Sequence, residues 1–323
     1  MSTAFRPVRW LPGAHLQTIV PALWPAGSVR GQAERCTVAV GGGSAVRLET
    51  HRPPGRHRGT LLLVHGLGGS AESGYMRHTA HQALERAWCV ARMNLRNCGG
   101  TEALARTLYN AGQSEDVACV LEQLAGAGWP APFAVAGFSL GGNIVLRYAG
   151  RAGGAARADA VVGINPPIDL EPCARALEAP HNRWYQRHLT AALRRQVRRI
   201  RAVRPCGGPE PGRARTVRQF DALFTAPDAG YASAEAYYAD ASAASVLSGL
   251  RRPGLVLSAE NDPLVPATIF EPHGRVPALK LWLLPAGGHC GYWQSGRPRF
   301  WAASALLDFL EGIREFRPGA GRA

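Results

Sequence analysis

The sequence predicts an α/β fold built on a doubly wound, mostly parallel β-sheet. Short apolar runs alternate with segments of helical periodicity along most of the chain, as in a sheet that carries helices on both faces. Several runs, such as residues 60–64, are continuously apolar, which is typical of strands buried on both sides. With 323 residues, 46% of them hydrophobic, the chain is expected to form one large domain over residues 1–323.

The expected elements follow one another in a regular order. A hairpin is predicted around three glycines, with strands at 36–40 and 45–51, ahead of the first buried strand at 60–64. Apolar runs and helical periodicity then predict strands at 88–94, 133–136, 160–164, 254–259 and 279–284, and helices at 114–125, 143–149 and 299–316. This alternation supports the parallel sheet.

Three segments depart from the alternation. Residues 1–30 hold four prolines and two tryptophans and are expected to form an irregular arm packed on the domain by its aromatic side chains. Residues from about 170 to 247 show no strand pattern and are expected to form a lid over the carboxyl ends of the strands. The tail at 318–323 is expected to be disordered.

The lid segment supports two further predictions. Arginines at helical spacing near residues 194–201 predict a basic amphipathic helix, which could contact a membrane surface or could simply be a solvated face. Apolar and aromatic side chains of the same segment are expected to line an acyl slot: Trp184, Tyr185, Leu189, Phe220, Phe224, Tyr237 and Tyr238.

Composition excludes several classes of function. The net charge is +14, but 37 basic residues include only one lysine, Lys280, so we interpret the charge as compositional bias and predict no nucleic-acid partner. The seven cysteines form no C-x-x-C pair, which argues against a disulfide framework and a zinc site. No metal or organic cofactor is implied. The sequence shows no signal peptide and no apolar stretch near the ~20 residues that span a bilayer, so a cytoplasmic protein is expected.

A serine in a tight turn is the candidate nucleophile. Ser139 is the centre of a G-x-S-x-G motif that lies between a predicted strand and a predicted helix. Gly137 and Gly141 leave room for a sharp turn that exposes the serine hydroxyl. The backbone N–H of Leu140, at the start of the helix, is a candidate oxyanion donor. The other candidate donor is the N–H of Leu67, in the glycine-rich loop that follows the strand at 60–64.

An acid and a histidine follow late strands, in the order that serine hydrolases of this topology require. Asp262 follows the strand at 254–259, and His289 follows two glycines after the last strand. Histidine can take the serine proton near neutral pH, and a carboxylate on its other nitrogen fixes the tautomer. Glu260 is the nearest substitute for Asp262; Asp240 and Asp308 fall in the lid and in the last helix. His65, which precedes the oxyanion glycines, is interpreted as structural.

The motifs resemble those of one known family. They read HLQTI at 15–19, HGLGG at 65–69, NLRNCGG at 94–100, SED at 114–116, GFSLGGN at 137–143, FD at 220–221, YY at 237–238, DP at 262–263 and GGHCGY at 287–292. Together they resemble the YheT-type branch of the α/β-hydrolase superfamily, which includes medium-chain ethyl ester synthase/esterases and ABHD-type lipases. The resemblance implies an α/β-hydrolase fold and a triad of Ser139, Asp262 and His289.

Two residues depart from the family pattern. Asn97 stands where the family often has a glycine, and Asn261 stands where it often has a second acidic residue. The second change leaves Asp262 as the only aspartate of its loop.

The sequence therefore predicts a serine carboxylic-ester hydrolase of short- to medium-chain acyl esters, with a small-molecule ester as its substrate and an acyl-enzyme on Ser139. Transfer of the acyl group to an alcohol is the alternative chemistry, and a catalytically silent binding protein is the alternative class. The oligomeric state and the acyl length cannot be predicted.

Overall fold

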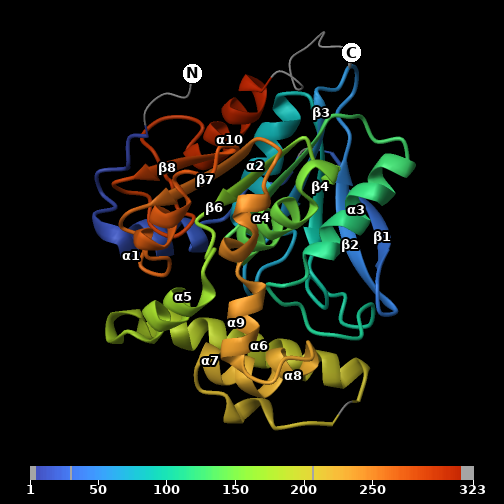
Figure 1. Cartoon of the computed structure of the whole chain (residues 1–323). Coiled ribbons are helices and arrows are strands. Elements are labelled where there is room, and N and C mark those ends of the chain that lie inside the picture. The colour runs from blue at the N-terminus through green and yellow to red at the C-terminus, as the bar shows by residue number, and fades with distance from the viewer. Residues whose placement is uncertain (1–4, 30, 206, 314–323) are drawn as a thin grey trace.

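The computed structural model describes residues 5–29, 31–205 and 207–313. An eight-stranded sheet crosses the molecule and carries helices on both faces (Figure 1). The strand order is β1-β2-β4-β3-β5-β6-β7-β8. Neighbours from β4 to β8 are parallel, whereas β1 and β2 are antiparallel to each other and β2 is antiparallel to β4. The predicted fold class is confirmed.

The strands lie where the apolar runs predict them. Four of them, β4, β6, β7 and β8, have the predicted bounds. In chain order the strands are β1 Glu34–Val40, β2 Ser44–His51, β3 Gly59–Val64, β4 Trp88–Asn94, β5 Phe133–Phe138, β6 Ala160–Ile164, β7 Gly254–Ala259 and β8 Leu279–Leu284.

Alternate side chains of each central strand point into different cores. In β3, Leu62 and Val64 belong to the core under α3 (Ser114–Gly126) and α4 (Leu140–Ala152). Leu61 and Leu63 belong to the core under α2 (Gly74–Glu85) and α10 (Trp301–Gly312). All of these strand side chains are fully buried, which explains why the run has no polar alternation.

The sheet has a topological switch point between β3 and β5. The chain leaves β3 to form β4 on one side and later returns to form β5 on the other side. In open α/β sheets, ligands bind at the carboxyl ends of the strands at such a point. The loops after β3 and β5 are therefore the first place to look for a site.

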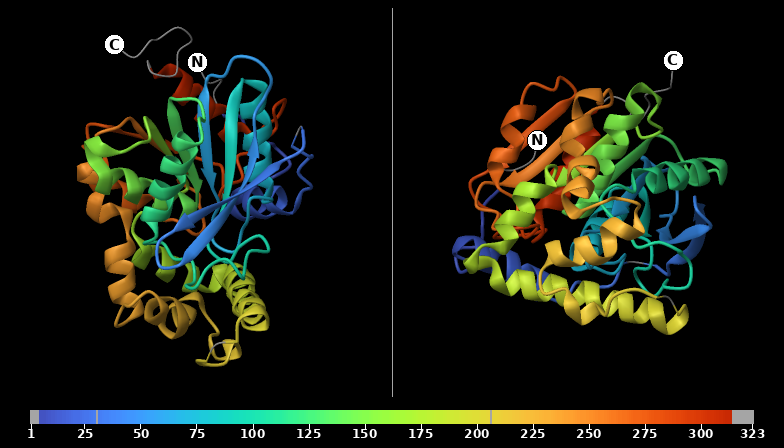
Figure 2. Two further views of the ribbon diagram at one scale, coloured as in Figure 1. Left: turned by 90° about the vertical axis from the view of Figure 1, so that its right-hand side faces the viewer. Right: turned by 60° about the horizontal axis from the view of Figure 1, so that its bottom comes forward.

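A group of helices joins β6 to β7. They lie together beyond the ends of the strands, at the bottom of Figure 1, and the left view of Figure 2 shows them below the sheet. Within residues 165–253, residue 206 excepted, the chain forms no strand. The α-helices are α5 Leu170–Glu178, α6 Arg183–Val203, α7 Val217–Phe220, α8 Ala226–Asp228 and α9 Ala234–Ala241.

Outside the group that joins β6 to β7, two helices were not predicted. The arm expected to be irregular contains α1 (Gly13–Leu23), in which Pro21 lies in the last turn, so that its missing N–H removes the helical hydrogen bond to only one carbonyl, that of Gln17. The sequence analysis also missed α2, because its buried positions include polar and small residues such as Thr79 and Ala80. In the part of the chain that the structure describes, no helix is both long and apolar enough to cross a membrane. The tail at 318–323 lies outside the described residues.

Candidate active site

Ser139 lies in a strained turn between β5 and α4. Its backbone has φ 50° and ψ −123°, a conformation that residues other than glycine rarely adopt. A Cβ atom on Gly137 would overlap the carbonyl of Gly141, and a Cβ atom on Gly141 would overlap the carbonyl of Val64. The Ser139 N–H donates to the carbonyl of Ile164 at 2.8 Å, which anchors the turn to the end of β6.

The structure brings Ser139, His289 and Asp262 together. His289 Nε2 lies 2.9 Å from Ser139 Oγ, and His289 Nδ1 lies 2.8 Å from Asp262 Oδ2. The other carboxylate oxygen, Asp262 Oδ1, accepts the N–H groups of Leu264 at 2.8 Å and Val265 at 3.1 Å. A carboxylate held in this way accepts a hydrogen bond from Nδ1–H. Nε2 then carries no proton and can take the proton of the serine hydroxyl.

The rival groups lie elsewhere. Glu260 is exposed, whereas Asp262 is buried. Asp240 pairs with Arg147 at 3.1 Å, and Asp308 pairs with an arginine of α2's C-terminal turn, Arg86. None of these three carboxylates lies within ion-pair distance of His289, whereas Asp262 does. Asp262 is therefore its carboxylate partner.

Asn165 supports the acid and the histidine loop at once. It directly follows β6 with φ 45° and is fully buried. Its Nδ2 donates to Asp262 Oδ2 at 2.6 Å and to the Gly288 carbonyl at 3.1 Å. Its Oδ1 accepts the N–H of Cys290 at 3.2 Å. The sequence analysis missed this residue, whose only local signal is its position directly after a buried strand.

Helix α1 supports the histidine loop from the other side. Thr18 Oγ1 accepts the backbone N–H of His289 at 2.8 Å and donates to the Ala14 carbonyl at 2.7 Å. Gln17 Oε1 accepts the N–H of Gly287 at 2.9 Å and the side-chain amide of Asn261 at 3.1 Å. The HLQTI motif thus fixes the loop that carries His289.

Of the four backbone N–H groups at residues 66–69, in the loop after β3, one has no acceptor among the described residues. The N–H groups of Gly66 and Gly68 donate to the hydroxyls of Tyr75 at 3.0 Å and Tyr109 at 2.8 Å, and that of Gly69 donates to the Gly66 carbonyl at 3.1 Å. Among the described residues, none accepts a hydrogen bond from the N–H of Leu67. Leu140, as the first residue of α4, likewise has no partner for its N–H within the helix.

His65 holds this loop in place. It is fully buried, and burial lowers its pKa to about 4, so the ring is neutral near pH 7. Its Nε2 accepts the N–H of Leu95 at 3.1 Å, and its Nδ1 therefore donates to the Gly66 carbonyl at 2.8 Å. These contacts give His65 a structural role.

A cavity of about 510 Å³ opens onto Ser139 and His289. It lies between α1, the helices after β6 and the loop after β3, and its walls are mainly apolar. This size is typical of a small-molecule site. Its lining includes five of the seven residues expected to form an acyl slot: Trp184, Tyr185, Leu189, Tyr237 and Tyr238.

The other two expected slot residues are not in the cavity wall. Phe220 and Phe224 stack on each other with ring centroids 4.8 Å apart and lie in the core beneath α7. They were predicted from their apolar character alone, which does not distinguish a cavity wall from a core. The sequence analysis also missed the wall that α1 supplies, including Ile19 and Leu23.

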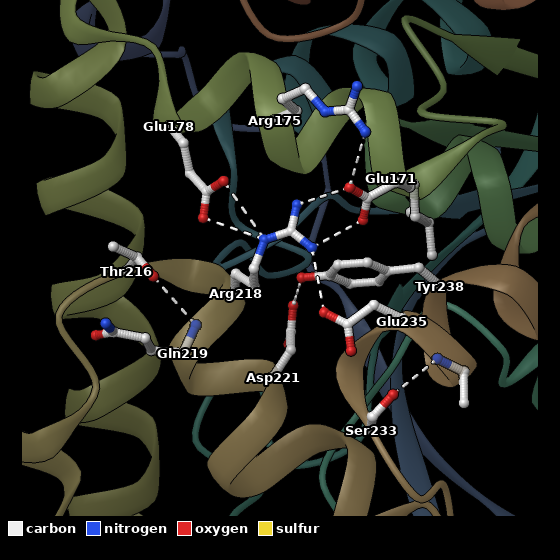
Figure 3. A network of polar contacts seen from close by, with 12 residues as sticks. Glu171, Arg175, Glu178, Thr216, Arg218, Gln219, Asp221, Ser233, Glu235 and Tyr238 are labelled. Atoms are coloured by element: carbon white, nitrogen blue, oxygen red, sulfur yellow. Dashed lines mark hydrogen bonds and ion pairs between the residues drawn. The ribbon is translucent and has the colours of Figure 1, made fainter.

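Arg218 joins three helices around the cavity (Figure 3). Its guanidinium group pairs with Glu171 of α5 at 2.8 Å, with Glu178 at the end of α5 at 3.2 Å, and with Glu235 of α9 at 3.5 Å. It also lies 5.5 Å from the ring centre of Tyr238, which lines the cavity. One cation on α7 therefore ties α5, α7 and α9 together.

Asp221 is a buried carboxylate in the same region. It lines the cavity and accepts the hydroxyl of Tyr238 at 2.7 Å (Figure 3). In the described chain no arginine, lysine or histidine lies within ion-pair distance of it. Burial raises the pKa of Asp221 to about 6, despite the opposing effect of the Tyr238 hydrogen bond.

Asn97 adopts a backbone conformation that explains the family's preference for glycine. Its φ is 59°, in the left-handed region that glycine adopts most easily and asparagine tolerates. Its side-chain amide donates to the Thr107 carbonyl at 2.6 Å. Asparagine can therefore replace glycine at this position without a change in the backbone conformation of the loop.

The sequence matches a known family along most of its length. The family described as "alpha/beta hydrolase fold" matches residues 59–295. "Putative esterase YheT" of Escherichia coli (strain K12) is 31% identical over 318 residues, which cover 96% of this chain and 93% of the relative. "Phospholipase ABHD3" of Mus musculus is 31% identical over 248 residues, which cover 75% of this chain and only 60% of the relative. These matches confirm the resemblance that the motifs predict.

Solved structures share the fold. The Pyrococcus furiosus esterase Pf2001 superposes with a TM-score of 0.58 at 16% sequence identity, over 89% of this chain and 99% of the other. At this identity the likeness concerns the fold alone.

The first prediction concerns the acid. Asp262→Asn should keep the hydrogen bonds from Leu264 and Val265 but favour the wrong tautomer of His289. We expect the reaction of Ser139 with a fluorophosphonate probe to slow by up to ~10⁴-fold, as in serine-protease triads. The rate of covalent labelling measures the effect. Glu260→Gln is the control and should react at the wild-type rate; the reverse result would place the acid at Glu260.

The second prediction concerns α1. Thr18→Val keeps the shape of the side chain but removes the acceptor for the His289 N–H. Small displacements of catalytic groups cost up to about 10²-fold in rate, so labelling at saturating probe should slow within that range while probe affinity stays the same. Thr18→Ser should restore the rate. Equal losses in Thr18→Val and Thr18→Ser would contradict a role of the hydroxyl.

The third prediction concerns Asp221. Its pKa in the fold, about 6, lies above its ordinary value of 3.8, so the fold disfavours the ionised form. The contribution of Asp221 to stability therefore falls as pH rises from about 4 to about 6 and stays low above that. Asp221→Asn should change stability little at low pH and raise it by up to about 3 kcal/mol near pH 8. Urea unfolding of both proteins across this range measures the difference; a pH-independent difference would contradict the raised pKa.

Proposed function

The chain belongs to the α/β-hydrolase fold family, and from that premise we propose that it is a serine esterase that forms an acyl-enzyme on Ser139. The observation that carries the proposal is the continuous hydrogen-bonded path from Ser139 Oγ through His289 to Asp262, at 2.9 Å and 2.8 Å. The names of the relatives, an esterase and a phospholipase, support ester hydrolysis. A cytoplasmic location stays a prediction.

The chemistry follows from the hydrogen bonds. Ser139 Oγ attacks the ester carbonyl and gives its proton to His289 Nε2, while Asp262 stabilises the imidazolium through Nδ1. The tetrahedral intermediate collapses when His289 protonates the departing alkoxide. Water then attacks the acyl-enzyme, with His289 as base, and releases the acid and Ser139.

The oxyanion donors that we propose are the N–H groups of Leu67 and Leu140. The neighbouring N–H groups of Gly66, Gly68 and Gly69 already donate to Tyr75, Tyr109 and the Gly66 carbonyl, which supports the choice of Leu67. The position of Leu140 at the helix N-terminus, where the macrodipole favours negative charge, supports the other donor. One such donor typically contributes about 10²–10³ in turnover.

The cavity favours an acyl chain of short to medium length. Its volume of about 510 Å³ and its mainly apolar lining suit a hydrocarbon chain better than a charged group. An alcohol could also enter and take the acyl group, so transfer to an alcohol remains the alternative chemistry.

The fourth prediction tests substrate class. Each methylene buried in the cavity contributes ~0.8 kcal/mol, or about fourfold in kcat/KM. With p-nitrophenyl esters of increasing chain length, kcat/KM should rise steeply from acetate and level off when the cavity is full. Ser139→Ala should abolish both turnover and fluorophosphonate labelling.

Two results would contradict the proposal. A profile that peaks at acetate and falls with every added carbon would rule out the acyl slot. Fluorophosphonate labelling that persists in Ser139→Ala would rule out the nucleophile, and absence of labelling in the wild-type protein would favour a silent binding protein.

A further inference from the structure

The mouth of the cavity is bordered by exposed apolar side chains. Leu23 at the end of α1 is 70% exposed, and Trp184 at the start of α6 is 50% exposed, yet both also line the cavity. Trp24, the next residue after α1, is 48% exposed and packs edge-on against Trp293 of the cavity wall. Large apolar side chains on a protein surface are unremarkable singly, but here they surround one opening.

Helix α6 presents a row of arginines beside this opening. Its buried face, which includes Leu193, Val197 and Ile200, packs on the core. The opposite face carries the exposed residues Arg183, Arg187, Arg195 and Arg198, together with Trp184 and His188, whose rings stack 5.2 Å apart. The right view of Figure 2 shows α6 lying along one side of the molecule, with α1 near the end at which α6 begins.

These arginines have no ion-pair partner in the part of the chain that the structure describes. Within the described residues, no carboxylate lies at ion-pair distance from Arg183, Arg187, Arg195 or Arg198, although Arg199 pairs with Glu102 at 2.7 Å and Arg201 with Glu210 at 3.7 Å. Four guanidinium groups on one face are thus available for external anions.

We propose that this face, made of the exposed side of α6 and the end of α1, docks on a bilayer that contains anionic phospholipid. Arginines can bind lipid phosphates while tryptophan and leucine enter the interfacial layer of the bilayer. Helices that lie in a membrane surface combine the same kinds of residue. The cavity mouth then opens toward the lipid, from which an acyl ester can enter. A nucleic acid fits this surface less well, because its phosphates would pair with the arginines but would leave the exposed apolar side chains of Leu23 and Trp24 without an apolar partner.

The surface goes beyond the proposed function, and its binding can be measured without turnover. The fifth prediction uses the Ser139→Ala chain, so that lipids stay intact, in co-flotation with vesicles of phosphatidylcholine alone or mixed equally with phosphatidylglycerol. Binding should require phosphatidylglycerol and should weaken with added salt. Arg183→Gln with Arg187→Gln should lower the partition coefficient roughly 25-fold, from about fivefold for each arginine near an anionic surface.

The matched control removes the same charge from positions that precede strands, at the end of the sheet opposite to the active site. Arg56→Gln with Arg275→Gln changes two exposed arginines that precede β3 and β8, and should leave vesicle binding unchanged. Trp184→Ala should weaken binding without any change in charge. Equal effects of the two arginine pairs would show that only net charge matters and would overturn the proposal. Binding of a DNA duplex but not of anionic vesicles would overturn it in favour of nucleic acid.

A second measurement separates this proposal from the esterase proposal. In the protein that retains Ser139, Arg183→Gln with Arg187→Gln should leave the hydrolysis of a water-soluble ester unchanged. The same pair of changes should slow the hydrolysis of an ester presented in anionic vesicles. Vesicle binding without any ester hydrolysis would contradict the esterase proposal alone. Ester hydrolysis without vesicle binding would contradict the docking surface alone.

Discussion

The hydrogen bonds of one buried amide at the end of β6 determine how the site is assembled. Ser139, Asp262 and His289 come from three loops. Asn165 bonds directly to Asp262 and to the residues on either side of His289, Gly288 and Cys290. The carbonyl just before it, that of Ile164, accepts the Ser139 N–H. The φ of Asn165 is 45°, a value that is strained for most residues but accessible to asparagine. Loss of this side chain would leave several buried polar groups unsatisfied, at a cost of about 1–3 kcal/mol each.

A pair of amides completes the support of the histidine loop. Asn261 Nδ2 donates to Gln17 Oε1 at 3.1 Å, and Asn261 Oδ1 accepts the Gly288 N–H at 3.0 Å. An acidic residue at this position, as the family often has, could accept from Gly288 but could not donate to Gln17. Asparagine at position 261 therefore allows the hydrogen bond to Gln17, and it keeps a second negative charge away from Asp262.

Sequence patterns predict the parts of this structure that local physics determines. Continuous apolar runs predict the central strands because both faces of a parallel sheet are buried, and the turn glycines identify Ser139 because only glycine fits beside it. The bonds of Thr18 to His289 and of Asn165 to Asp262 and Cys290 could not be predicted, since they join residues that lie 97 to 271 positions apart in the sequence. Helix α1 was missed because Pro21 suggests a break. Yet the proline lies near its end, and a Cβ atom on Gly291 would overlap the Gln17 carbonyl, so loop and helix pack in direct contact.

The walls of the cavity differ in what holds them. On the side of α5, α7 and α9, the ion pairs of Arg218 connect three helices, so a change in the cavity there would have to break several charged contacts together. On the side of α1 and α6, a hydrogen bond 3.1 Å long joins His15 to Tyr185, no ion pair connects the two helices among the described residues, and the lining side chains Leu23 and Trp184 reach solvent. A substrate that enters from solvent or lipid therefore meets the α1 and α6 side first. We therefore propose that the opposite wall, whose ion pairs resist expansion, limits the acyl length that fits.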